Sequence, residues 1–176
     1  MGQRAADQPE EGDLDLLGRY DAALPRVYGY LLPRCGSRVL AEDLTAETFR
    51  AAVEAVRQYP GTPVSTGWLV GVARHKLVDH WRRQAREESA LRSLGTETPA
   101  EDPWDQQLDA LRARAVLYRL APHHRAALVL RYLDDLPVPE VAALLGRSLH
   151  ATEALLVRAR TAFRRRYSEE EEGGDG

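Results

Sequence analysis

Apolar residues recur every three or four positions along most of the chain, and this helical period constrains the fold more than any other feature. Alanine, leucine, arginine and glutamate dominate the composition, and all four favour helices. Runs of β-branched residues, which would favour strands, are scarce. The sequence therefore predicts an all-α protein.

Local signals divide this pattern into separate helices. Pro25 lies inside the first periodic run and is expected to bend it or to mark a joint. The segment 59–63, Tyr-Pro-Gly-Thr-Pro, breaks the chain, and Ser65 and Thr66 are candidate N-caps for the helix that follows. The expected helices lie at 13–33, 41–58 and 67–88, from Leu108 and from Pro122 onward, around Pro139, and at 149–167.

The helical period fades over residues 89–105, which contain Gly95, two threonines, two prolines and four acidic side chains. This is the best candidate boundary between two domains. The predicted organisation is a disordered acidic N-terminus (1–11), a helical domain (12–88), a flexible acidic linker (89–105), a second helical domain (106–167) and a disordered acidic tail (168–176).

Charge is sorted along the chain, so the net charge of −3 is misleading. Residues 1–15 carry a net charge of −4, whereas residues 147–166 carry six arginines and only Glu153, which gives +5. A basic stretch between acidic blocks is typical of a polyanion binder. The alternative is that these arginines form the solvated face of a terminal helix.

Several function classes are not supported by the sequence. No apolar stretch approaches the roughly 20 residues that span a bilayer, and the N-terminal segment has no apolar core of a signal peptide. Cys35 is the single cysteine, and His75 and Asp79 have no third metal ligand nearby. Phosphate-binding glycine loops and nucleophile motifs are also missing. We therefore expect a cytoplasmic, non-enzymatic protein without membrane insertion, cofactor or metal.

Residues 138–166 combine a short helix, a turn at Gly146 and a longer basic helix, which is the helix-turn-helix pattern. Gly146 permits the sharp turn, and Ser148 can cap the second helix. We expect Leu149, Leu156, Ala159 and Phe163 to face inward, and Ala151, Leu155 and Arg158 to face DNA. An ordinary helical hairpin is the alternative.

Three segments here resemble region 4 of sigma factors. They are Leu120–Tyr132 (the family's L-P-x-x-x-R-x-x-x-x-L-R), Val138–Gly146 (E-I-A-x-x-L-G) and Val157–Arg160 (x-R-A-R). Glu153 and Leu155 stand where the family usually has basic residues, and Thr152 stands where it has an apolar one. An apolar side chain can contact a thymine methyl group, and a glutamate can accept a hydrogen bond from cytosine N4. The helix is therefore predicted to recognise these groups in DNA. The residues that the resemblance implies at the minus-thirty-five element are Arg147, Ser148, His150, Ala151, Glu153, Leu155, Arg158 and Arg160.

The segment Ala41–Phe49 is similar to the A-E-D-L-x-Q-E-T-F stretch of sigma region 2, with Ala46 in place of glutamine. The resemblance implies that this helix docks on the β′ clamp helices of RNA polymerase. The residues expected to bind polymerase are Asp43, Leu44, Glu47 and Phe49, with Phe49 as the apolar anchor. The alternative is a solvated acidic helix face with Phe49 in the core.

The segment 68–83 resembles the part of region 2 that opens the promoter and recognises the minus-ten element. Its basic side chains can contact phosphates, and its polar and aromatic neighbours can hold an unstacked base. Trp68 is expected to pack inside the domain. The residues implied at the minus-ten element are Arg74, His75, Lys76, Asp79, His80, Arg82 and Arg83.

With both patterns in the family's order, the chain is identified as a member of the extracytoplasmic-function group of sigma factors. The resemblance implies that it binds core RNA polymerase through the β′ clamp helices and the β flap. It also implies promoter DNA and an anti-sigma factor as partners. The alternatives are a stand-alone helix-turn-helix regulator of the LuxR type and a protein-binding helical adaptor.

Overall fold

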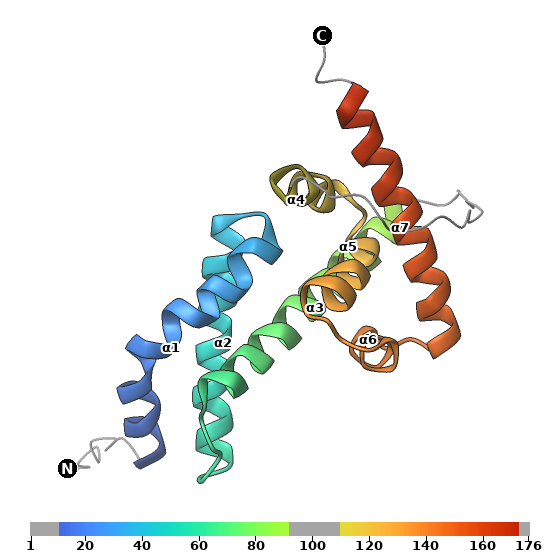
Figure 1. Cartoon of the computed structure of the whole chain (residues 1–176). Coiled ribbons are helices and arrows are strands. Elements are labelled where there is room, and N and C mark those ends of the chain that lie inside the picture. Colours follow the sequence, from blue (N-terminus) through green and yellow to red (C-terminus); the bar gives the residue numbers. More distant parts are fainter. Residues whose placement is uncertain (1–10, 92–109, 173–176) are drawn as a thin grey trace, which may run out of the picture. The chain divides into compact units, whose positions relative to one another are not determined.

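The computed structural model describes residues 11–91 and 110–172, and all the elements in these ranges are helices (Figure 1). The all-α prediction is therefore confirmed. In chain order the elements are α1 (Glu11–Cys35), α2 (Arg38–Gln58), α3 (Thr66–Leu91), α4 (Ala110–Arg119), α5 (Pro122–Leu128), the π-helix η1 (Val129–Leu133), α6 (Val138–Leu145) and α7 (Leu149–Glu172).

The helix boundaries follow local signals in the sequence. The Ser65 hydroxyl accepts a hydrogen bond from the Trp68 amide at 3.1 Å, so Ser65 caps α3, and Thr66 is the first residue of that helix. Pro25 lies inside a continuous α1. The sequence predicts disorder from residue 168, whereas α7 continues to Glu172.

The chain divides into two compact units, and the division falls inside α3: an N-terminal unit (residues 1–76) and a C-terminal unit (residues 77–176). Most of the predicted linker, from residue 92 onward, lies outside the described residues, as do residues 1–10 and 173–176. The domain limits drawn from the sequence therefore stay a prediction.

In the N-terminal unit, α1 and α2 lie side by side (Figure 1). The rings of Tyr20 and Phe49 join the two helices, with 4.7 Å between their centroids. Two threonines are buried in α2 because their hydroxyls donate to backbone carbonyls one turn earlier. The buried side chains of this unit are Ala23, Val27, Leu31, Cys35, Ala41, Leu44, Thr45, Thr48, Phe49, Ala52, Val56, Val64, Leu69 and Ala73.

In the C-terminal unit, α4, α5 and α6 all pack against α7. The Arg125 guanidinium donates to the carbonyls of Tyr118 (2.6 Å) and Leu120 (3.1 Å), and so joins α5 to the end of α4. Near the far end of α7, Arg112 lies over the Tyr167 ring, 4.1 Å from its centroid. The Arg112 contact thus joins α4 to α7, and the Arg125 bonds join α4 to α5.

The C-terminal part of the α5–η1 run is wound as a π-helix, and its last turn is closed by a bond from the Asp134 amide to the Val129 carbonyl at 3.0 Å. Arg131 then holds the following turn, donating to the Leu136 carbonyl at 3.2 Å and pairing with Asp135 at 3.6 Å. The chain is thereby turned toward α6. Within the described residues, none of the helices is both long enough and apolar enough to cross a membrane.

Candidate functional site

The turn between α6 and α7 has the geometry that the sequence predicts. Gly146 adopts a left-handed conformation (φ 63°, ψ 40°), which a residue without Cβ reaches at least cost. The amide of Arg147 bonds the Ala142 carbonyl at 3.0 Å, which closes the end of α6. The Ser148 hydroxyl then accepts from the Ala151 amide at 3.2 Å and caps α7, as predicted. The two helices are thus joined by a short, well-bonded turn.

The predicted orientation of α7 is wrong for two of its leucines. Leu155, expected to face DNA, is only 1% exposed, and Leu149, expected to face inward, is 48% exposed. Leu156 and Phe163 are buried as expected, together with Ala159. Leu155 therefore packs inside the unit, and we do not retain it as a DNA-contacting residue.

Thr152 explains part of this difference. It is fully buried because its hydroxyl donates to the Ser148 carbonyl at 2.9 Å, which satisfies the polar group within the helix. With Thr152 inside, the buried stripe runs through Leu155 and Leu156. Leu149 lies on the Leu156 flank of this stripe, but it is the first residue of α7 and half of its side chain is exposed.

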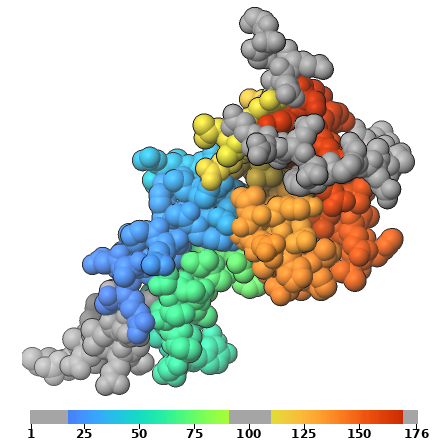
Figure 2. Space-filling model, in the orientation of Figure 1, coloured from blue at the N-terminus to red at the C-terminus, as the bar shows by residue number. Residues whose placement is uncertain are grey.

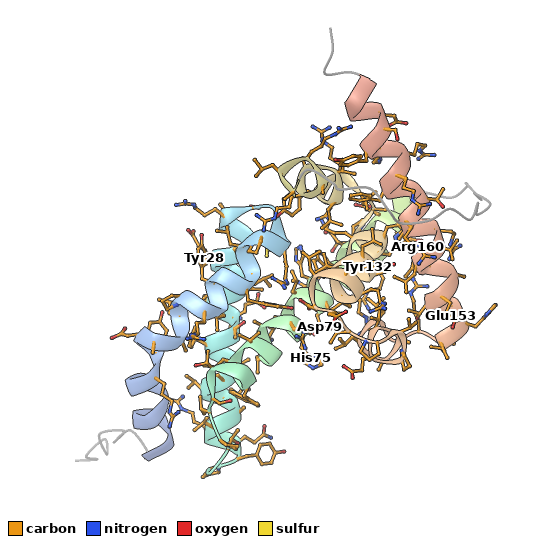
Figure 3. All side chains as sticks on the ribbon, viewed as in Figure 1. Tyr28, His75, Asp79, Tyr132, Glu153 and Arg160 are labelled. Atoms are coloured by element: carbon orange, nitrogen blue, oxygen red, sulfur yellow. The ribbon has the colours of Figure 1, made fainter. Side chains whose placement is uncertain are left out.

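The remaining predicted residues lie on the open surface of this unit. Arg147, Ser148, His150, Glu153 and Arg158 are exposed, and Ala151 and Arg160 are partly exposed. Glu153 projects from the first turns of α7 (Figure 3). The orange surface of residues 138–150 is uncovered in the space-filling view (Figure 2).

Arg160 is directed to one side of this surface. Its guanidinium donates to the Tyr132 hydroxyl at 3.2 Å, and Figure 3 shows the two side chains together. Arg147 and Arg158, by contrast, make no salt bridge with any described residue and point into solvent. These two cations are the ones best placed to meet phosphates.

Two residues on this surface escaped the sequence analysis. Ala154 is exposed and Val157 is partly exposed, and both lie about half a turn from the buried stripe. Counting Thr152 among the inward-facing residues would have placed Ala154 and Val157 on the outward side. The sequence analysis left Thr152 out of the buried stripe because its side chain is polar.

The predicted docking residues on α2 divide into two pairs. Asp43 is exposed and Glu47 is partly exposed. Leu44 and Phe49 are buried, and the Phe49 ring, 7% exposed, lies tilted against the Tyr20 ring. The prediction that Phe49 is an exposed apolar anchor is therefore wrong, since the ring belongs to the core between α1 and α2. Arg50, three residues after Glu47, is also exposed, so the surface that α2 offers to a partner is charged and carries both signs.

On α3 the predicted residues follow one side of the helix. His75, Asp79, Arg82 and Arg83 are exposed at helical spacing, and His75 and Asp79 lie along the same side in Figure 3. The carboxylate of Asp79 lies 3.8 Å from the Arg82 guanidinium. Lys76 and His80 are partly exposed beside this side.

Arg74 differs from the other basic residues of α3, because it lies over the Tyr30 ring of α1 with 6.0 Å to the centroid. The two tryptophans also differ: Trp68 is partly exposed, whereas Trp81 is buried. In the described ranges, no group of three histidine, cysteine, aspartate or glutamate side chains could hold a metal ion. The chemistry that this arrangement offers is recognition by charge and shape.

Comparisons with known proteins agree with the two-part pattern. The family model described as Sigma-70 region 2 matches residues 19–87, and the model described as Sigma-70, region 4 matches residues 110–163. The chain is 32% identical to the ECF RNA polymerase sigma factor BldN of Streptomyces coelicolor, over 87% of this chain and 61% of that protein. It is also 32% identical to the RNA polymerase sigma factor CarQ of Myxococcus xanthus, over 83% of each chain. The chain thus spans about 60% of the length of BldN and most of the length of CarQ.

A solved structure supports the fold. The sigma factor RpoE from Bartonella quintana, crystallised in complex with the anti-sigma factor NepR, matches with a TM-score of 0.51 and 20% identity. The match covers 86% of this chain and 95% of that chain. At this level of identity the likeness concerns the arrangement of helices.

Proposed function

Because the chain belongs to the extracytoplasmic-function group of the sigma-70 family, we propose that it binds core RNA polymerase and directs promoter recognition, DNA melting and transcription initiation. The observation that carries this proposal is the presence in one chain of two exposed polar surfaces, one on α3 within the region 2 match and one on α7 within the region 4 match. A promoter has two elements that are read at once. Two such surfaces in one chain meet that requirement.

The polymerase-binding surface in this proposal is the side of α2 that carries Asp43 and Glu47. Asp43 and Glu47 are one turn apart and accessible, so they suit a basic partner such as the β′ clamp helices. Leu44 and Phe49 act from inside by holding α2 against α1. The β flap is the second polymerase contact that family membership suggests.

DNA contacts are assigned to the exposed sides of α3 and α7. Around the minus-ten element, Arg82 and Arg83 contact phosphates, and His75 and Asp79 lie close enough along α3 to meet an unstacked base. At the minus-thirty-five element, α7 enters the major groove, with Arg147 and Arg158 on the phosphates.

The chain has no chemical step of its own in this proposal, since the polymerase carries out RNA synthesis. It works in the cytoplasm, where polymerase and chromosome are found. An anti-sigma factor is the further partner that we propose from family membership, and co-purification with the chain expressed in its own host tests for it.

A reconstitution experiment tests the function. The purified chain is mixed with core RNA polymerase, and the transcripts made from genomic DNA are sequenced. Defined start sites that depend on the chain support the proposal. Binding to DNA alone with no affinity for polymerase would indicate a stand-alone regulator, and binding to neither would indicate a helical adaptor.

A charge-matched pair of variants locates the docking surface. Asp43→Asn with Glu47→Gln is expected to weaken binding to core polymerase by at least tenfold, with unchanged helicity. Glu140→Gln with Glu153→Gln removes the same two charges from the C-terminal unit, where both side chains are exposed. In the absence of DNA this control should bind polymerase as the unmodified chain does. Equal affinity of both variants would place the docking surface elsewhere.

A further inference from the structure

The burial pattern of α7 defines which side of the helix can enter a groove. The side chains that hold α7 in the unit are Thr152, Leu155, Leu156, Ala159 and Phe163. An α-helix advances about 100° per residue, so these five side chains lie within one narrow sector. The opposite side is therefore fixed by the structure.

Four residues of the first four turns lie on that opposite side: His150, Ala154, Val157 and Thr161. Ala154 lies near its centre and is exposed, and Val157, three residues later, is partly exposed. Arg158 is exposed on the flank. The outward side thus carries the apolar pair Ala154 and Val157 between the polar His150 and Thr161, with Arg158 at its edge.

This composition limits how bases can be read. Guanine is commonly recognised by arginine or lysine, and adenine by asparagine or glutamine, each through two hydrogen bonds. The centre of the outward side has none of these side chains. Small apolar side chains make their contact with the C5-methyl group of thymine, which projects into the major groove.

We propose that Ala154 and Val157 are specificity-determining residues that read thymine methyl groups in the minus-thirty-five element, while Arg147 and Arg158 bind the flanking phosphates. This inference rests on the proposed function, because it takes α7 to be the helix that enters promoter DNA. It also moves methyl recognition from the buried Leu155 to two residues that are accessible.

The test uses deoxyuridine, which differs from thymidine only by the missing C5-methyl group. Duplexes are first selected from a random pool by the full chain assembled with core polymerase. Each thymidine of the upstream selected element is then replaced in turn by deoxyuridine, and the affinity is measured. A methyl group that contacts the protein is expected to contribute about three- to fivefold in affinity.

Variants assign the contact to its residue. For each thymidine, the affinity for the unmodified duplex is divided by the affinity for the duplex with deoxyuridine at that position. Val157→Ala and Ala154→Ser should each bring this ratio close to one at the position whose methyl group the replaced side chain contacts. The ratio compares two DNAs on the same protein, so a partial loss of folding cancels. Leu149→Ala is the matched control, because Leu149 is exposed but lies away from the centre of the outward side. Its ratio should be unchanged.

The outcomes separate this inference from the proposed function. Methyl reading is overturned if the chain supports transcription but deoxyuridine lowers the affinity at no position. It is also overturned if both variants keep the affinity loss that the unmodified chain shows. In either case the sigma-factor function stands. If the chain does not bind core polymerase, the sigma-factor function is overturned. Methyl reading is then tested by selecting duplexes with the free chain and measuring the same deoxyuridine replacements on them. Failure to select any duplex overturns both.

Discussion

Two leucines of α7 provide the sharpest test of how this helix is oriented. Leu155 is 1% exposed and Leu149 is 48% exposed, although the two residues are of the same type in the same helix. Replacing a buried leucine with alanine removes three carbon groups at about 0.8 kcal/mol each, or about 2.4 kcal/mol. The cavity that remains raises the expected loss for Leu155→Ala to about 3–5 kcal/mol. Leu149→Ala should cost at most about 1 kcal/mol, since half of that side chain already contacts water.

Urea unfolding followed by circular dichroism measures these differences, and hydrogen exchange of the α5 and α7 amides reports on the C-terminal unit itself. A loss of 3–5 kcal/mol is a large part of the total stability of a small domain, which is about 5–15 kcal/mol. Leu155→Ala should therefore shift the transition strongly, and Leu149→Ala should hardly move it. Equal losses, or a larger loss at Leu149, would refute the orientation of α7 and the methyl-reading proposal with it.

Three further predictions concern other parts of the chain. Phe49→Ala should destabilise the N-terminal unit by about 3–5 kcal/mol in thermal or urea unfolding, because its ring packs against Tyr20 in the core; an unchanged transition with lost polymerase binding would restore Phe49 as a docking anchor. Arg125→Lys should lower the stability of the C-terminal unit by about 1–3 kcal/mol, since a lysine cannot reproduce the planar fork that donates to two carbonyls of the α4–α5 connection; stability equal to that of the unmodified chain would contradict this. The low apolar content of residues 89–105 predicts preferential cleavage there in limited proteolysis, with two helical fragments remaining, and a single resistant core across this segment would count against the proposed domains.

The sequence by itself determined the features that depend on short-range interactions. Helix formation follows from hydrogen bonds between residues four apart and from side-chain preferences, so the all-α class could be predicted from the spacing of apolar residues. Ser65, Gly146 and Ser148 could be assigned for the same reason, because a cap or a left-handed turn involves only the next few residues. The family motifs also lie in contiguous segments, which is why the two-region pattern was visible before the fold was known.

Only the tertiary structure decided which sides of these helices are buried. The first turns of α7 carry apolar residues nearly all round, so more than one stripe could have faced the core. Packing against α5 and α6, with the Thr152 hydroxyl satisfied within the helix, selected the stripe through Leu155 and left Leu149 in solvent. Phe49 likewise stands as the apolar anchor in the motif, whereas its ring packs against Tyr20 of a separate helix, α1. Burial is a property of contacts between elements far apart in the chain, and a local pattern therefore leaves it open.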